Sequence, residues 1–157
     1  MTFDDSRRLT GPNLYTPSPG AVLDLYVGAI PVADAVAAWE HHARRLLDAV
    51  GWTKSALFAR PFEGGASVGF TAPEDALYAA TEVNEAAWKA AAAELSGEDL
   101  PDGAPGAERL RAEIEAERNP ALLALREAAA VRGVAFLPDD DFVSVGLGTG
   151  SQTWPVS

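Results

Sequence analysis

Apolar residues recur at steps of three and four over residues 31–51, which is the period of a helix with one buried side. These positions are Val32, Val36, Trp39, Ala43, Leu46 and Val50. Pro31 stands where the first turn of a helix tolerates proline, and Gly51 stands where a helix ends. The pattern therefore predicts a helix of about five turns.

A second helical pattern runs from Thr71 to about Leu95. Thr71 and Glu74 have the spacing of a capping box, which predicts the helix start. The inner stripe consists of Leu77, Ala80, Asn84, Trp88, Ala91 and Leu95. A loop over 96–106 follows, and then a charged helical stretch from Ala107 to Gly133. Asn119-Pro120 divides this stretch into a helix pair, because the residue before a proline avoids helical geometry.

Five segments predict strands. Residues 21–28 alternate and predict a strand with one dry face. Two short strands, 56–62 and 66–71, are joined by the glycine-containing turn Glu63-Gly64-Gly65. Two more, 134–137 and 142–147, flank the acidic turn 138–141. Residues 11–20 hold three prolines and two glycines, which predicts an extended, folded-back arm rather than a helix.

This order of elements predicts an α+β fold. We expect a small mixed or antiparallel sheet with two long helices packed on one face, and an additional C-terminal helix pair. Residues 1–145 are expected to form a single domain. The glycine-rich residues 146–157 are expected to be an exit segment or a linker toward a further domain.

Composition narrows the function classes. The chain has 157 residues, is 48% hydrophobic and carries a net charge of −11, with the acidic excess confined to residues 61–157. Such a surface repels phosphate backbones, so no nucleic-acid partner is expected. A cationic partner would suit it, and the alternative is that the acidic charge only keeps the protein soluble. No stretch is apolar enough for a membrane helix, and the start MTFDDSRR lacks the features of a secretory signal. A cytoplasmic protein without a membrane partner is therefore predicted.

Neither a metal site nor a catalytic set is predicted. The chain has no cysteine, which excludes disulfides, thiolate zinc sites and cysteine nucleophiles. His41 and His42 are adjacent, so they point about 100° apart on a helix and do not chelate one ion. We expect His42 at the edge of the core and His41 in solvent. The segment GLGTGS over 146–151 lacks the lysine and the following helix of a phosphate-binding loop.

Three residues of the second long helix are candidates for binding. Glu82 and Glu85 lie one turn apart and are able to meet a basic group, although charged pairs of this kind usually form a solvated face. Asn84 falls within the inner stripe, where a buried amide must find partners. We expect Asn84 to hydrogen-bond a loop backbone, such as the Gly11–Asn13 arm, with ligand contact as the second possibility.

The N-terminal stretch RRLTGPNLY supplies the remaining candidates. Arg7 and Arg8 are suited to clamp a carboxylate, because a guanidinium pairs with it through two parallel hydrogen bonds. Asn13 is suited to read an amide or to cap the turn that Gly11 and Pro12 begin. The alternative is that the arginines pair with nearby acids and that Gly11-Pro12-Asn13 is only a turn.

The segment LTGPNLY, followed by a strand, resembles the opening of cyanophycin synthetases, whose N-terminal domain starts with an Arg/Thr-Gly-Pro-Asn-aromatic segment. The likeness continues through EHHARRLLDAVGW and GGASVGFTAPEDALYAATEVNEAAW and covers residues 7–92. The tail DDDFVSVGLGTGSQTWPVS is similar to the junction at which related bacterial Mur-ligase-like proteins enter their ATP-binding ligase domain.

This resemblance implies an accessory role. In that family the ATP-grasp and Mur-ligase-like modules form the amide bonds with ATP and Mg²⁺, and the first domain helps to hold the polymer or substrate. The present chain has neither module, so no catalytic residue and no cofactor are expected in it. Arg7, Arg8 and Asn13 would contact a carboxylate or amide of an Asp/Arg-containing peptide or polymer, and Glu82 and Glu85 would contact its basic groups.

The expected partner is a ligase domain in the same or another chain, with a homo-oligomer as a further possibility. An alternative function is a free-standing protein-interaction module without enzymatic activity. A third is a hydrolase that uses Glu82, Glu85 or His42, which the resemblance does not favour.

Overall fold

The computed structural model describes residues 1–99, 103–139 and 141–155. The chain divides into two compact units, Met1–Glu117 and Arg118–Ser157, so the boundary expected at residues 145 and 146 falls inside the second unit. Parts of three expected segments lie outside the described residues: 100–102 of the loop, Asp140 of the acidic turn, and 156–157 of the tail. Helices and antiparallel sheets occur together, which confirms the predicted α+β fold.

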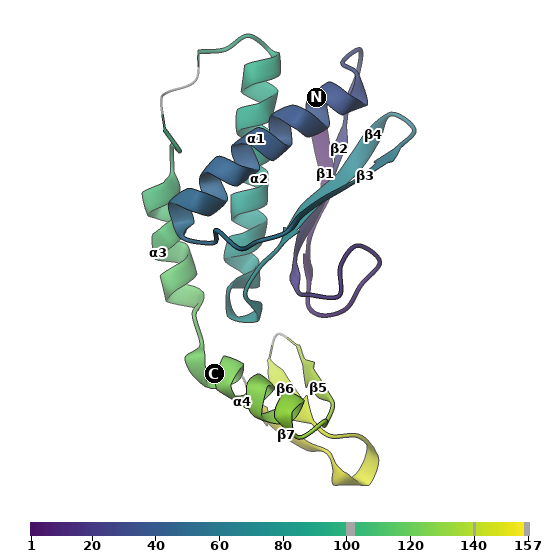
Figure 1. The fold of residues 1–157 in the computed structure, drawn as a ribbon, viewed down its shortest axis with the longest axis vertical. Coiled ribbons are helices and arrows are strands. Elements are labelled where there is room, and N and C mark those ends of the chain that lie inside the picture. The colour runs from purple at the N-terminus through teal and green to yellow at the C-terminus, as the bar shows by residue number, and fades with distance from the viewer. Residues whose placement is uncertain (100–102, 140, 156–157) are drawn as a thin grey trace. The chain divides into compact units, whose positions relative to one another are not determined.

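The first unit is a four-stranded antiparallel sheet whose strand order is β1-β2-β4-β3. Two long helices, α1 and α2, cover one face of this sheet, and α3 packs beside them (Figure 1). In chain order the elements are β1 (Thr2–Leu9), β2 (Gly20–Tyr26), α1 (Val32–Val50), β3 (Leu57–Phe62), β4 (Gly65–Thr71), a 3₁₀ turn (Glu74–Ala76), α2 (Leu77–Leu95) and α3 (Ala107–Glu117).

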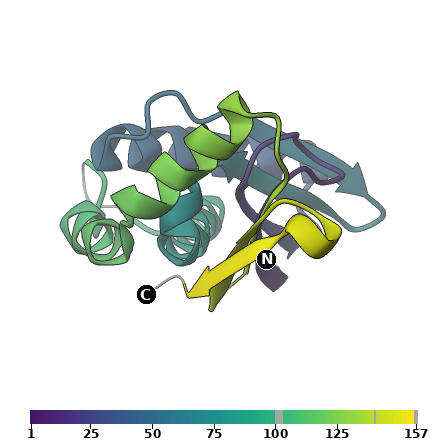
Figure 2. The same cartoon turned by 90° about the horizontal axis from the view of Figure 1, so that it is seen from below.

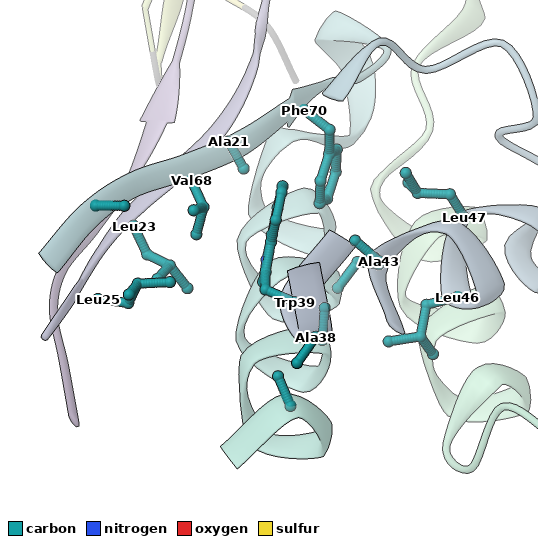
Figure 3. Packing of buried hydrophobic residues seen from close by; sticks show 14 of the residues in the cluster. Ala21, Leu23, Leu25, Ala38, Trp39, Ala43, Leu46, Leu47, Val68 and Phe70 are labelled. Carbon is teal, nitrogen blue, oxygen red and sulfur yellow. The ribbon is translucent and has the colours of Figure 1, made fainter. Parts of the chain in front are cut away.

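The core of this unit lies between the sheet and the two long helices. Trp39 of α1 is fully buried and stands between the sheet side chains and the rest of α1 (Figure 3). The sheet contributes Ala21, Leu23, Leu25, Ala66, Val68 and Phe70, and the helices contribute mainly alanine and leucine. Small alanines on α1 and α2 let the helices approach one another and the sheet closely, so that one large ring fills the centre.

Asn84 belongs to this core, and its hydrogen-bond partners differ from the loop backbone that the sequence predicted. Its side chain is completely buried; its Oδ1 accepts a hydrogen bond from Trp39 Nε1 at 2.9 Å, and its Nδ2 donates to the Val68 carbonyl at 3.1 Å. The expected bond to the Gly11–Asn13 arm is therefore wrong. Asn84 ties α2 to α1 and to the central strand β4, and it has no access to a ligand.

Two local features of the first unit differ from the sequence prediction. Residues 2–9 form strand β1, which the sequence analysis did not predict. The expected capping box is also wrong, because Thr71 Oγ1 accepts a hydrogen bond from the Ala56 backbone N–H, and α2 begins at Leu77 after the 3₁₀ turn. Pro73 extends the chain away from β4, so that the helix axis starts one turn later than the pattern indicated.

The second unit contains α4 (Pro120–Val131) and a three-stranded antiparallel sheet in the order β5-β6-β7. The predicted break at Asn119-Pro120 is confirmed: Asn119 caps α4, its Oδ1 accepting from the Leu122 N–H at 3.1 Å. The strands are β5 (Phe136–Pro138), β6 (Phe142–Val145) and β7 (Gln152–Pro155). Strand β7, the yellow arrow in Figure 2, forms part of the tail that was expected to be an irregular exit segment.

Candidate functional site

The sheet of the first unit has a second face, opposite the helices, which we call the open face. Because side chains alternate along a strand, Ala21, Leu23 and Leu25 point to the helices and their neighbours point to the open face. The register of the four strands arranges the open-face residues in rows across the sheet. One row is Tyr26, Gly65 and Phe62; the next is Asp4, Asp24, Ser67 and Arg60; the third is Arg7, Val22, Gly69 and Phe58.

The glycines of β4 shape this face. A methyl group on Gly65 would lie 2.8 Å from the Phe62 ring, and one on Gly69 would lie 2.6 Å from the Phe58 ring. The two phenylalanine rings therefore lie over the glycines of the neighbouring strand. Since Gly65 has no side chain, Tyr26 and Phe62 meet across β4, with ring centroids 5.4 Å apart.

A charged network crosses the middle of the open face. Arg7 Nη1 lies 3.2 Å from Asp24 Oδ2 and 2.7 Å from Asp5 Oδ2, and Ser67 Oγ donates to Asp24 Oδ1 at 2.5 Å. Arg7 thus pairs with nearby acids, which was the alternative to a carboxylate clamp. An aspartate in the middle of an apolar strand is satisfied here by two donors from the neighbouring strands.

The environment of Arg7 favours its charged form. Burial alone lowers the pKa of the Arg7 guanidinium, but the charge of Asp24, the hydrogen bond to it and the charge of Asp5 raise that pKa overall. A cation with a raised pKa in the folded state stabilises the fold at every pH below its ordinary pKa, and this contribution is lost only when the pH rises through the raised value. Arg7 therefore remains charged throughout the neutral range.

The arm between β1 and β2 is fixed to this network through Tyr15. The Tyr15 hydroxyl accepts from Arg7 Nη2 at 2.9 Å and lies 3.4 Å from Ser67 Oγ. Its ring stacks on Phe58 with a centroid distance of 5.2 Å and an interplanar angle of 18°. The Arg60 guanidinium lies 5.1 Å from the centre of the same ring, within cation–π distance. The predicted folded-back arm is confirmed, and it covers one end of the open face.

Asn13 holds the turn of this arm. Its Oδ1 accepts from the Tyr15 and Thr16 backbone N–H groups at 2.8 and 3.0 Å, and its Nδ2 donates to the Gly11 carbonyl at 2.8 Å. Asn13 therefore caps the turn that Gly11 and Pro12 begin, one of the two roles predicted for it. Pro12 is exposed and Gly11 is half-buried, with open space around the latter's Cα.

Removal of the Tyr15 side chain is expected to release the arm. We predict that Tyr15→Ala lowers the free energy of unfolding by about 1–2 kcal/mol, because two hydrogen bonds and one ring stack are lost. It should also speed amide exchange at Asn13 and cleavage of the arm by proteases.

The neighbouring Leu14 supplies the matched control, since its side chain is 81% exposed. Leu14→Ala should leave both stability and amide exchange unchanged. Equal protease sensitivity of Tyr15→Ala and the wild type would contradict the anchoring role.

The other predicted site residues lie on the helix side of the sheet. Arg8 points away from the open face and places its guanidinium 3.9 Å from the centre of the Tyr78 ring. Glu82 is close to Arg109, with Oε2 and Nη1 3.7 Å apart, and Arg109 also pairs with Glu113. Glu85 lies half-buried on the next part of α2.

A shallow pocket of about 400 Å³ lies between α2 and α3, lined by Tyr78, Ala79, Thr81, Glu82, Glu113, Ala116 and Glu117. One of its acids has a structural role. The Glu117 carboxylate accepts hydrogen bonds from the backbone N–H groups of Tyr78 and Ala79 at 2.8 and 2.7 Å. It thereby caps the start of α2, which lacks a capping side chain of its own.

Both histidines have the exposure that the sequence predicts. His42 is buried, with Nε2 2.6 Å from Glu94 Oε2, whereas His41 is exposed, as predicted. Within the part of the chain that the structure describes, no group of three His, Cys, Asp or Glu residues is placed to hold a metal ion. In that same part, none of the helices combines the length and the apolar character that crossing a membrane requires.

Half of the site residues predicted from the sequence belong to the open face or to its arm. Arg7, Gly11, Pro12 and Asn13 belong to it or to its arm, whereas Arg8, Glu82, Asn84 and Glu85 do not. The missed residues are Asp4, Tyr15, Asp24, Tyr26, Phe58, Arg60, Phe62 and Ser67. Asp24 carried a usable signal, because a carboxylate flanked by leucines in a predicted strand must point to the opposite face and needs donors there.

No protein-family model matches the chain, and no curated protein is significantly similar to it in sequence.

Proposed function

We propose that this chain is a non-catalytic accessory domain of an ATP-dependent amide ligase of the cyanophycin synthetase and Mur ligase kind. It presents or holds a peptide-like substrate while a ligase domain, in the same or another chain, binds ATP and Mg²⁺ and forms the bond. The observation that carries the proposal is the open face. The segment that bears the family resemblance folds back onto this face through Tyr15, and an exposed aromatic pair stands beside it.

The binding part of this face is a patch formed by Asp4, Tyr26, Arg60 and Phe62. Tyr26 and Phe62 are 42% and 37% exposed, so both rings are accessible. Asp4 and Arg60 are both exposed in the adjacent row, one on each outer strand. A guanidinium stacks favourably on such rings and pairs with a carboxylate, and a ligand carboxylate pairs with Arg60. A polymer of aspartate and arginine offers both groups at short spacing.

A calorimetric titration with short peptides of repeated Asp-Arg units tests this function. We expect measurable binding by the wild type and a loss of about tenfold in affinity for Tyr26→Ala and Phe62→Ala, because each removes one stacking surface. Tyr78→Ala is the matched control, since Tyr78 is also an exposed tyrosine but lies at the start of α2 on the helix side. Absence of heat at millimolar peptide, or equal affinity of all variants, would rule out substrate presentation by this face.

A free-standing interaction module is the second candidate, and the second unit favours it. Exposed large apolar side chains are concentrated there: Val131, Val134, Leu137, Phe142, Leu147 and Trp154. The reading frame downstream of Ser157 separates the two functions. A continuous frame that encodes a Gly-Lys-Thr phosphate-binding loop supports the accessory domain, and a stop codon supports the module.

A further inference from the structure

The hydrogen-bond ladder of the second unit leaves one strand edge ready to pair. Gly146 donates to the Ala135 carbonyl and Asp139 donates to the Phe142 carbonyl, both at 2.8 Å. In an antiparallel pair the bonded positions alternate, so Phe142 and Ser144 turn their backbone groups toward β5. Val143 and Val145 then turn theirs toward β7, where they face Trp154 and Gln152.

The same alternation determines which backbone groups of β7 point away from β6. Gln152 and Trp154 use their backbone groups on β6, so the N–H and C=O of Thr153 point to the free edge. Pro155 follows at a position where an N–H would also point outward, and it has none. The Thr153 side chain is exposed and bonds Ser144, with Oγ1 and Oγ 2.7 Å apart, which holds the strand in place. Thr153 therefore offers both a donor and an acceptor at this edge, and the Pro155 carbonyl is a further outward acceptor.

In the part of the chain that the structure describes, the other edge strands are highly charged, bulged or very short. Edge strands usually carry charges, bulges or prolines that prevent pairing with another chain. Strand β1 has a bulge between Asp4 and Arg7 and is highly charged, and β3 carries Arg60 and Pro61. Strand β5 is only three residues long and ends in Pro138; strand β7, which ends in Pro155, is one residue longer. By contrast, no charged side chain occurs in residues 142–155, which include all of β6 and β7.

The charge distribution along the chain favours a second copy of the chain as the partner of the β7 edge. Residues 1–117 contain nine basic and nineteen acidic residues, a net charge of −10, whereas residues 118–157 contain three and four, a net charge of −1. The first units of two copies therefore repel each other strongly. The second units are nearly neutral, so two copies associate through them with little repulsion. Trp154 of β7 and Phe142 of the adjacent strand β6, each about half exposed, add apolar surface next to this edge.

We propose that β7 pairs antiparallel with β7 of a second copy of the chain, across a two-fold axis at Thr153. In that register the Thr153 N–H of each copy donates to the Thr153 carbonyl of the other, which satisfies both outward groups. Gln152 of one copy then lies opposite Trp154 of the other, and the two three-stranded sheets become one continuous six-stranded sheet. The pairing is independent of the proposed substrate role, which belongs to the first unit.

Sedimentation equilibrium of the full chain tests the pairing. The interface is small, so we expect a reversible dimer with a Kd of about 10–100 μM. Thr153→Pro removes the outward N–H at a position where an edge strand tolerates proline, and it should abolish the dimer. Thr153→Val removes only the hydroxyl group and should keep it. A wild type that stays monomeric at about 1 mM would overturn the proposal.

A second variant tests the interface independently, in case the proline variant does not fold. Thr153→Lys keeps the backbone N–H but places two like charges opposite each other at the two-fold axis, where they are destabilising. We expect a monomer with an unchanged far-ultraviolet circular dichroism spectrum. If the proline and lysine variants both fold and dimerise like the wild type, β7 is not the interface.

Discussion

Replacement of Trp39 by alanine is expected to lower the free energy of unfolding of the first unit by about 3–5 kcal/mol. The indole is fully buried and stands between the sheet and helix α1, so its removal leaves a cavity that the alanines of α1 and α2 are too small to fill. Urea unfolding monitored by far-ultraviolet circular dichroism measures the loss. A marginally stable domain is expected to be largely unfolded by such a change.

Trp39→Phe separates the volume of the ring from its hydrogen bond. This variant keeps an aromatic ring in the core but removes the Nε1 donor to Asn84, and the expected loss is about 1–2 kcal/mol. If Trp39→Ala were no more destabilising than Trp39→Phe, the ring would not be packed as the structure has it.

The second large effect is expected for Asn84→Leu. Leucine has the same branched shape and number of side-chain heavy atoms, but it leaves Trp39 Nε1 without an acceptor and removes a donor to the Val68 carbonyl, in a site closed to water. Unpaired polar groups in the interior cost about 1–3 kcal/mol each, so we expect a loss of about 2–3 kcal/mol in the same urea experiment. The result separates a structural Asn84 from one that serves a ligand.

Two controls sharpen this measurement. Lys89→Leu makes a similar change at an exposed position of the same helix and should alter stability by less than about 0.5 kcal/mol. The double variant with Trp39→Phe should lose less than the sum of the single losses, because both changes break the same bond. Full additivity would mean that the two side chains do not interact.

Elements with a strong apolar period were predictable from the sequence. Helix α1 was expected at its observed place, because its stripe, its Pro31 start and its Gly51 end agree with one another. The hairpin of β3 and β4 followed from two apolar runs around a glycine turn. The break before α4 followed from Asn119-Pro120. In each of these cases local geometry and burial favour the same structure.

Strand β1 was missed because its pattern is obscured. The strand lies at the edge of the sheet, and it carries Asp4, Asp5, Arg7 and Arg8 in place of an apolar alternation. Asp5 also adopts a positive φ of 52° within a bulge, which shifts the alternation by one position. Strand β7 was missed for a different reason: its glycine-rich approach and polar residues are typical of a linker, and only pairing with β6 makes it a strand.

The partners of the side chains on the open face were also not predictable from the sequence alone. The sequence left two roles open for Arg7 and Asn13, a ligand contact or an internal partner, and the structure pairs Arg7 with Asp24 and Asn13 with the turn of the arm. The partner of Arg7 is set by strand register, which one sequence does not specify. Tyr26 and Phe62 meet only because Gly65 stands between them in the sheet.

Binding of the ligand by the open face is tested most directly by nuclear magnetic resonance, with the assigned backbone amides of the full chain followed during titration with a peptide of repeated Asp-Arg units. We expect shifts at Asp4, Tyr26, Arg60 and Phe62 and at the turn that joins β3 to β4. Shifts confined to the pocket between α2 and α3, or no shifts at millimolar peptide, would contradict it.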